Sequence, residues 1–159
     1  MTLEEIRRVK YRYLRCVDLK QWDELADVLT EDAVADYGTH AAGGPLRLEG
    51  RDAIVGYLRD NVGPDIITEH FASHPEIDVD GNHARGTWFF ADTVIATNHR
   101  VVIRGSAYYH DEYRKCSDGK WRIAHTRYER TFETMMSLDD MPSLKFLTNR
   151  WAAQEAQTS

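Results

Sequence analysis

The chain has 159 residues, 42% of them hydrophobic and 29% charged, which is the composition of an ordinary globular protein and argues against disorder. A net charge of −6 argues against nucleic acid or an anionic membrane surface as a partner. Since no apolar stretch could span a bilayer and no signal-peptide pattern opens the chain, we expect a cytoplasmic protein without membrane insertion. The length fits a single domain over residues 1–159.

The first part of the sequence has the spacing of helices. Residues 3–18 carry apolar side chains every three or four positions, which predicts one amphipathic helix. Residues 22–29 repeat this spacing, and residues 51–58 predict a third helix before a Gly-Pro stop. Between the last two helices we expect a short strand over residues 33–37 and a glycine-rich loop over residues 38–45.

The second part of the sequence reads as strands. Residues 66–79, which Pro75 interrupts, are followed by long extended segments at 83–97, 100–115 and 121–131. Helices followed by long antiparallel strands predict an α+β fold, with helices on one face of a curved sheet. Such a sheet, closed by helices, forms a blind and mostly apolar pocket that suits hydrophobic small molecules.

The end of the chain, residues 132–159, is rich in methionine, leucine and aromatic residues. This segment is too apolar for a free tail. We therefore expect it to pack on the body as a lid or on a neighbouring subunit as an interface.

The layout resembles the SnoaL-like branch of the nuclear transport factor 2 (NTF2) superfamily, from Leu3 to about Glu133. Within that branch it resembles the bile acid 7α-dehydratases and, more distantly, scytalone dehydratase. The matching motifs are residues 13–25, His70 within 69–77, Gly86-Thr87-Trp88, residues 107–113, Asp118-Gly119-Lys120-Trp121 and Tyr128-Glu129-Arg130. The resemblance implies an NTF2-like cone, with N-terminal helices packed on a strongly curved, mostly antiparallel sheet. It also implies a homotrimer or homodimer.

By position, the resemblance places a catalytic tyrosine at Tyr13, an aspartate at Asp18 and a histidine at His70. It also places a second pocket tyrosine at Tyr37 and a pocket arginine at Arg130, and two residues within its motifs, Trp88 and Tyr108, are further candidates for substrate binding. Two family features have no counterpart here. One is a further pocket tyrosine near the turn at residues 98–99, and the other is the second histidine that scytalone dehydratase carries on the strand matching residues 86–94.

The residue types fit acid–base chemistry, although each has a plainer interpretation. A histidine takes and gives protons near neutral pH, and a carboxylate partner fixes its tautomer. Taken alone, His70 could instead bond a backbone carbonyl, Asp18 could be solvated or cap the next helix, and Tyr13 could be core packing. Arg130 could lie at the surface. Other tyrosines compete with Tyr37 as pocket-lining residues: Tyr57, Tyr108, Tyr109, Tyr113 and Tyr128. A contact between Asp18 and His70 would distinguish these interpretations.

Neither a metal nor a cofactor is expected. His70 and His74 would lie roughly 13 Å apart along a strand, too far to bind one ion. Cys16 and Cys116 match neither a metal site nor a disulfide framework. No phosphate loop, nucleophile elbow or dinucleotide-binding fingerprint is present.

The resemblance, together with these residue types, therefore implies a cofactor-independent dehydratase. Such a lyase would remove water from a hydrophobic cyclic alcohol, steroid-like or polyketide-like, by His/Asp acid–base catalysis. Three alternatives share the same scaffold: a ketosteroid-isomerase-like enzyme, a polyketide cyclase and a non-catalytic small-molecule-binding protein.

Overall fold

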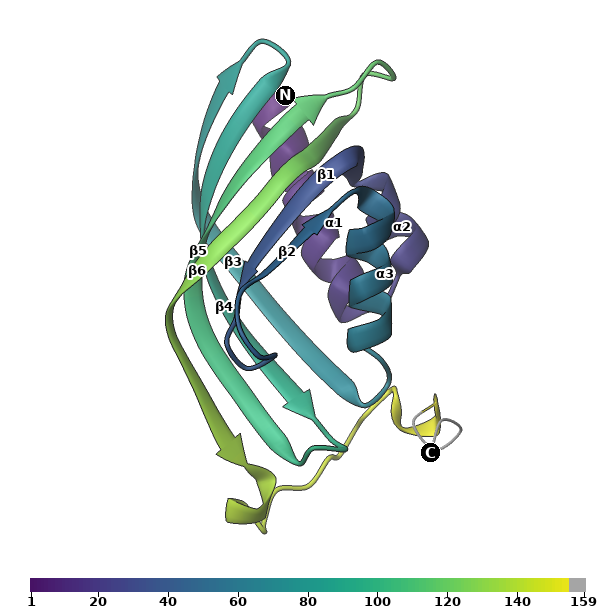
Figure 1. Cartoon of the computed structure of the whole chain (residues 1–159), viewed down its shortest axis with the longest axis vertical. Coiled ribbons are helices and arrows are strands. Elements are labelled where there is room, and N and C mark those ends of the chain that lie inside the picture. The colour runs from purple at the N-terminus through teal and green to yellow at the C-terminus, as the bar shows by residue number, and fades with distance from the viewer. Residues whose placement is uncertain (155–159) are drawn as a thin grey trace.

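The structure, a computed structural model, describes residues 1–154, and in this range six strands form one curved sheet (Figure 1). The strands follow the order β2-β1-β6-β5-β4-β3, and each neighbouring pair is antiparallel except β1 with β6. Their bounds are β1 (Leu29–Gly38), β2 (Leu46–Glu49), β3 (Ile66–Asp80), β4 (His83–Ala96), β5 (Val101–Lys115) and β6 (Trp121–Ser137). The α+β prediction is confirmed.

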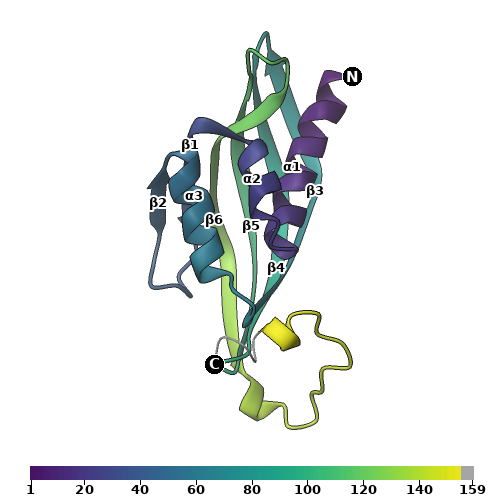
Figure 2. The same cartoon turned by 90° about the vertical axis from the view of Figure 1, so that its right-hand side faces the viewer.

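The helices cover the concave face of the sheet (Figure 2). They are α1 (Thr2–Asp18), α2 (Trp22–Asp27) and α3 (Arg51–Asn61), and a short 3₁₀ turn, η1 (Leu138–Asp140), follows β6. The apolar stripe of α1 is buried against the strands, as its spacing predicts, with Ile6 and Cys16 almost fully enclosed. No helix within residues 1–154 is long and apolar enough to cross a membrane.

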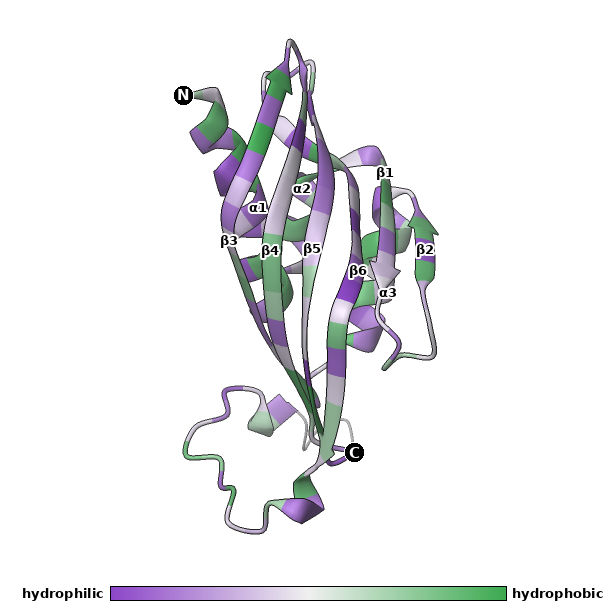
Figure 3. Ribbon diagram, turned by 90° about the vertical axis from the view of Figure 1, so that its left-hand side faces the viewer, coloured by the Kyte–Doolittle hydropathy of each residue, from purple (hydrophilic) through white to green (hydrophobic). Residues whose placement is uncertain are grey.

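Side chains alternate between the two faces of the long strands. On β4, Trp88 and Phe90 point into the core, whereas Phe89 packs on the opposite side against Phe71 and Tyr108. Hydrophilic and hydrophobic residues accordingly follow one another along the same long strands (Figure 3), and some apolar side chains, such as Phe71 and Tyr108, are exposed. This alternation determines which strand residues can reach the space under the helices.

Several predicted element bounds are wrong. β1 begins at Leu29 rather than at residue 33, and the four-residue strand β2 was not predicted. β3 continues through Pro75, because a bulge places His74 and Pro75 between the ladder pairs Ser73–Phe89 and Glu76–Thr87. Proline has no N–H to donate to a neighbouring strand, but a residue in a bulge is unpaired, so the strand pairing continues on both sides of Pro75.

The C-terminal segment is only partly a tail. Residues 132–137 continue β6 and pair with β5, where Ser137 lies opposite Val101, so this stretch is strand and not a lid. Beyond η1 the chain returns toward the end of α1, where the centre of the Trp151 ring lies 4.8 Å from Lys20 Nζ. Residues 155–159, the last part of the predicted lid or interface tail, lie outside the described residues.

Candidate active site

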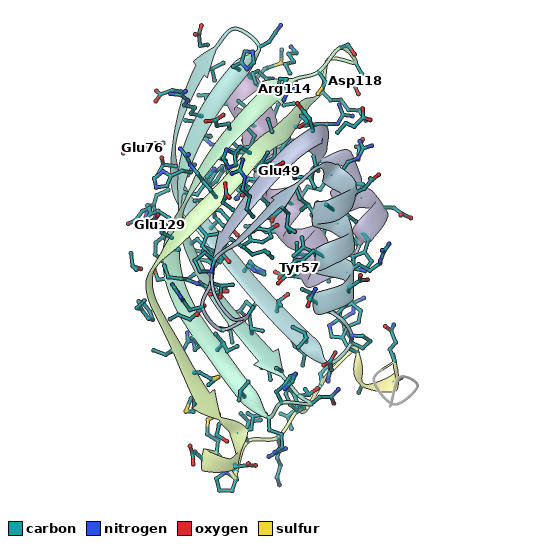
Figure 4. The ribbon with its side chains drawn as sticks, viewed as in Figure 1. Glu49, Tyr57, Glu76, Arg114, Asp118 and Glu129 are labelled. Carbon is teal, nitrogen blue, oxygen red and sulfur yellow. The ribbon has the colours of Figure 1, made fainter. Side chains whose placement is uncertain are left out.

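A cavity of about 930 Å³ lies between the helices, the loop after β1 and the concave face of the sheet. Its wall is mostly apolar, and its polar groups include His70, Asp92 and Arg130. Tyrosines from both layers line it: Tyr13, Tyr37, Tyr57, Tyr109 and Tyr128. Tyr57 lies on the side of α3 that faces the sheet (Figure 4). A large apolar cavity with a few converging polar groups is the usual form of a small-molecule site.

His70 and Asp18 form the contact that the sequence analysis singled out. His70 Nδ1 lies 2.5 Å from Asp18 Oδ1, and the two side chains are 14% and 22% exposed. Asp18 also accepts hydrogen bonds from Thr68 Oγ1 at 2.8 Å and from the His70 backbone N–H at 3.0 Å. A carboxylate held in this way favours the tautomer in which Nδ1 carries the proton and Nε2 is an acceptor.

Local structure explains why these two residues meet. Asp18 is the last residue of α1, and Lys20, just beyond it, has a positive φ of 55° that turns the chain away. The Lys20 ammonium donates to the Ile66 carbonyl at 2.7 Å and ties the helix end to the start of β3. Thr68 and His70 then follow on the same inward face of the strand, two residues apart. His70 lines the cavity, whereas Asp18 supports it from behind.

Tyr13 and Tyr37 form a second polar pair in the wall of the cavity. Their hydroxyls lie 2.6 Å apart, although the residues come from α1 and β1. Burial raises the pKa of Tyr13 well above its ordinary value, and the neighbouring Tyr37 and Tyr109 add to this effect. Burial also raises the pKa of Tyr37. Both hydroxyls therefore keep their protons at neutral pH, and one of them can donate to a ligand.

Arg130 reaches the cavity but is already paired. Its guanidinium makes a two-pronged contact with Asp92, at 2.7 Å and 2.9 Å, and its Nε lies 3.1 Å from Glu133 Oε2. Two neighbouring aromatic rings lie beside it, with the guanidinium carbon 5.2 Å from the Phe90 ring centre and 5.3 Å from that of Tyr128. The arginine is therefore a wall component with a fixed orientation.

Two predicted substrate contacts do not line the cavity. Trp88 is fully buried in the filled part of the core, where its Nε1 donates to the Tyr113 hydroxyl at 3.0 Å. Tyr108 is exposed on the outer face beside Phe89, because it follows the inward-facing Ala107 and alternation turns it away. Predicting them as substrate contacts was wrong for this cavity. Aromatic residues such as Tyr108 and Phe71 are exposed on the outer face. The homotrimer or homodimer that the resemblance implies stays a prediction.

Asp92 and Glu133 were not among the predicted site residues. The inward direction of Asp92 could have been predicted, since alternation along the strand puts it on the same face as Trp88 and Phe90. In the structure Asp92 lies directly opposite His70. The inward direction of Glu133 could not have been predicted by alternation, because it depends on a bulge in β6. Within residues 1–154, no group of three or more His, Cys, Asp or Glu side chains is placed to hold a metal ion.

Residues 2–127 match the family model of the SnoaL-like domain, which is more than half of the chain. The protein belongs to this family. An uncharacterised relative, Rv2910c of Mycobacterium tuberculosis, is 29% identical over 134 residues, which cover 83% of this chain and 87% of the relative.

Solved structures of low sequence identity share the fold. A candidate scytalone dehydratase from Novosphingobium aromaticivorans has a TM-score of 0.74 and 24% identity, covering 84% of this SnoaL-like chain and 86% of its own. The hexachlorocyclohexane dehydrochlorinase LinA-type3 from Novosphingobium barchaimii has a TM-score of 0.74 and 17% identity, covering 92% and 94% of the two chains. These likenesses confirm the NTF2-like fold. The narrower resemblance to the bile acid 7α-dehydratases stays a prediction.

Proposed function

We propose that this SnoaL-like protein is a cofactor-independent dehydratase that acts on a hydrophobic cyclic alcohol. The observation that carries the proposal is the Asp18–His70 pair, since Asp18 holds the Nδ1 side of the imidazole and His70 lines a tyrosine-rich cavity of about 930 Å³. A histidine base needs a fixed tautomer, a partner for the charge that develops on it and access to the substrate. This pair has all three.

In the proposed reaction, His70 Nε2 takes a proton from the carbon next to a substrate carbonyl. The electrons of that C–H bond move into the carbonyl as an enolate, then return to form a C=C bond as the neighbouring C–O bond breaks. The imidazolium gives its proton to the departing hydroxide, so water leaves and the histidine is neutral again. Asp18 stabilises the imidazolium between these steps.

Tyr13 and Tyr37 supply the stabilisation of negative charge. Because burial raises the pKa values of both hydroxyls, each remains a hydrogen-bond donor rather than an anion. One hydroxyl donates to the other at 2.6 Å, and the remaining proton can point to the substrate oxygen. Preorganised donors in a dry site are among the largest contributions to catalysis.

The limited size of the acid–base contribution supports a role for the cavity in positioning the substrate. General acid–base catalysis contributes roughly 10²–10⁴-fold, so most of the remaining acceleration must come from oriented binding in the apolar cavity. The names of two structural neighbours fit the same reaction type. A scytalone dehydratase and a hexachlorocyclohexane dehydrochlorinase are both named for an elimination, of water in one case and of hydrogen chloride in the other.

The test is a screen of cyclic β-hydroxy ketones, steroid-like and polyketide-like, with mass spectrometry of the products. Loss of one water molecule identifies dehydration, whereas isomerisation or cyclisation without that loss would identify one of the alternative activities. We expect His70→Ala to abolish turnover without changing the thermal unfolding curve. The matched control is His74→Ala, since His74 is exposed on the same strand and should not be needed. Near-normal turnover by His70→Ala would refute the mechanism.

A further inference from the structure

The cavity has a single strong cation, and that cation is already neutralised. Among the described residues that line the cavity, Arg130 is the only arginine or lysine. Asp92 and Glu133 both pair with it, so one guanidinium against two carboxylates leaves the cluster with a net charge of −1. The side chains of Arg130, Asp92 and Glu133 are only 6%, 4% and 11% exposed, so solvent screens their charges weakly.

The fold keeps this cluster in place. A bulge in β6 sets Ala107 opposite Arg130 but Gly105 opposite Glu133, so these two β6 residues face the same side despite lying three positions apart. Gly105 leaves the space that the guanidinium occupies, because a Cβ there would lie 2.8 Å from Arg130 Nη1. The guanidinium therefore packs closely on the backbone of β5 at Gly105, and the Phe90 and Tyr128 rings lie beside it.

Glu133 has a second task that keeps it in the cluster. Its Oε2 accepts from the Thr39 hydroxyl at 2.6 Å, and its Oε1 accepts from the backbone N–H groups of His40 and Ala41 at 2.9 Å and 2.8 Å. The loop that it anchors lines the cavity. Burial opposes ionisation of Glu133, but these hydrogen bonds and Arg130 outweigh burial and lower its pKa.

We propose that the Asp92–Arg130–Glu133 cluster determines specificity by making the cavity select an uncharged ligand. A ligand carboxylate could form a two-pronged contact with the guanidinium only by displacing Asp92 or Glu133, and the displaced buried carboxylate would be left without its partner. Any anion that enters beside the intact cluster meets a net negative wall. This inference rests on the proposed function only in taking the cavity as the substrate site.

The experiment compares two probes with one skeleton, a C19 steroid 17β-carboxylate and its methyl ester. Equilibrium dialysis at pH 7.5 gives the dissociation constant of each probe without any need for turnover. We expect the wild-type protein to bind the ester at least roughly tenfold more tightly than the carboxylate. Asp92→Asn should improve carboxylate binding and bring the ratio toward one, because it frees half of the guanidinium contact.

Glu133→Gln is a second variant that removes one negative charge from the same cluster, in case Asp92→Asn fails to fold. Asp78→Asn removes one charge from the exposed outer part of β3 and should leave the ratio unchanged. Equal affinities of the wild-type protein for both probes, tighter binding of the carboxylate, or no binding of the ester would overturn the proposal. Each outcome is independent of whether His70→Ala abolishes dehydration, so the two proposals can fail separately.

Discussion

Two histidine–aspartate pairs in this protein have nearly the same geometry but different surroundings. His70 Nδ1 lies 2.5 Å from Asp18, and His125 Nε2 lies 2.6 Å from Asp36. Their exposures are also close, at 14% and 22% for the first pair and 20% and 34% for the second. Short distance and partial burial therefore do not by themselves distinguish a candidate catalytic pair from a structural one.

The two pairs differ in the other hydrogen-bond donors to the carboxylate and in the surroundings of the imidazole. Asp36 also accepts from Arg47 Nη1, at 2.8 Å and 3.1 Å. Burial opposes ionisation of Asp36, yet its hydrogen bonds to His125 and Arg47 outweigh this and lower its pKa. His125 follows a bulge in β6 and turns to the outer face, whereas His70 lines the cavity. A pair becomes useful for proton transfer only where a substrate can reach it.

The largest expected effect compares Asp18→Asn with Asp36→Asn. Loss of the Asp18 carboxylate removes the partner that fixes the His70 tautomer and stabilises the imidazolium, so turnover should fall roughly 10²–10⁴-fold. Asp36→Asn should change turnover by less than about twofold, because its histidine faces away from the cavity. The measurement is kcat/KM for a substrate found in the screen. Similar losses in both variants would show that the pairs are not functionally distinct.

A third ion pair, Lys10 with Asp111, is completely buried and therefore cannot meet a substrate. Lys10 Nζ lies 2.8 Å from Asp111 Oδ2, and both side chains are 0% exposed. The Tyr113 hydroxyl donates to the same carboxylate at 2.9 Å. Burial lowers the pKa of Lys10, although Asp111 opposes the shift. Lys10 comes from the same helix as Asp18, yet with no route to a substrate its pairing is structural.

We expect Lys10→Met to destabilise the fold by about 3–5 kcal/mol, because it leaves a buried carboxylate without its cation. Urea denaturation followed by circular dichroism measures this change in the free energy of unfolding. The double variant Lys10→Met/Asp111→Leu should lose less than the sum of the two single changes, since it removes both charges together. Strictly additive losses would argue against a direct coupling of the two groups.

The comparison also shows how far sequence reading reached. Periodicity predicted α1, α3 and the long strands, and the resemblance paired Asp18 with His70. Register was the missing information, since every bulge reverses the face on which later side chains lie. Bulges in β6 turn His125 outward and bring Glu133 to the inner face. Neither bulge has a clear signature in the residue types, so the prediction of Arg130 as a substrate-binding residue did not include its pairing with Glu133.

The smallest expected effect concerns the loop that Glu133 holds. Glu133→Gln keeps the size of the side chain but replaces charge-assisted hydrogen bonds to the His40 and Ala41 amides with neutral ones. We expect hydrogen exchange at these two amides to accelerate roughly fivefold, since hydrogen bonds to charged groups are stronger by about 1 kcal/mol. Glu129→Gln is the matched control, because Glu129 is exposed and points away from the helices (Figure 4).

Acid should imitate the Glu133 variant in the wild-type protein. Because the folded pKa of Glu133 lies below its ordinary value of 4.5, the stabilisation is fully present above pH 4.5 and is lost as the pH falls through the folded pKa. Protection of the two amides, corrected for the intrinsic pH dependence of exchange, should therefore decrease only in acid. Glu133→Gln should not show this decrease. Unchanged protection in the variant at neutral pH would mean that the loop is held by its other contacts, and Glu133 would then serve Arg130 alone.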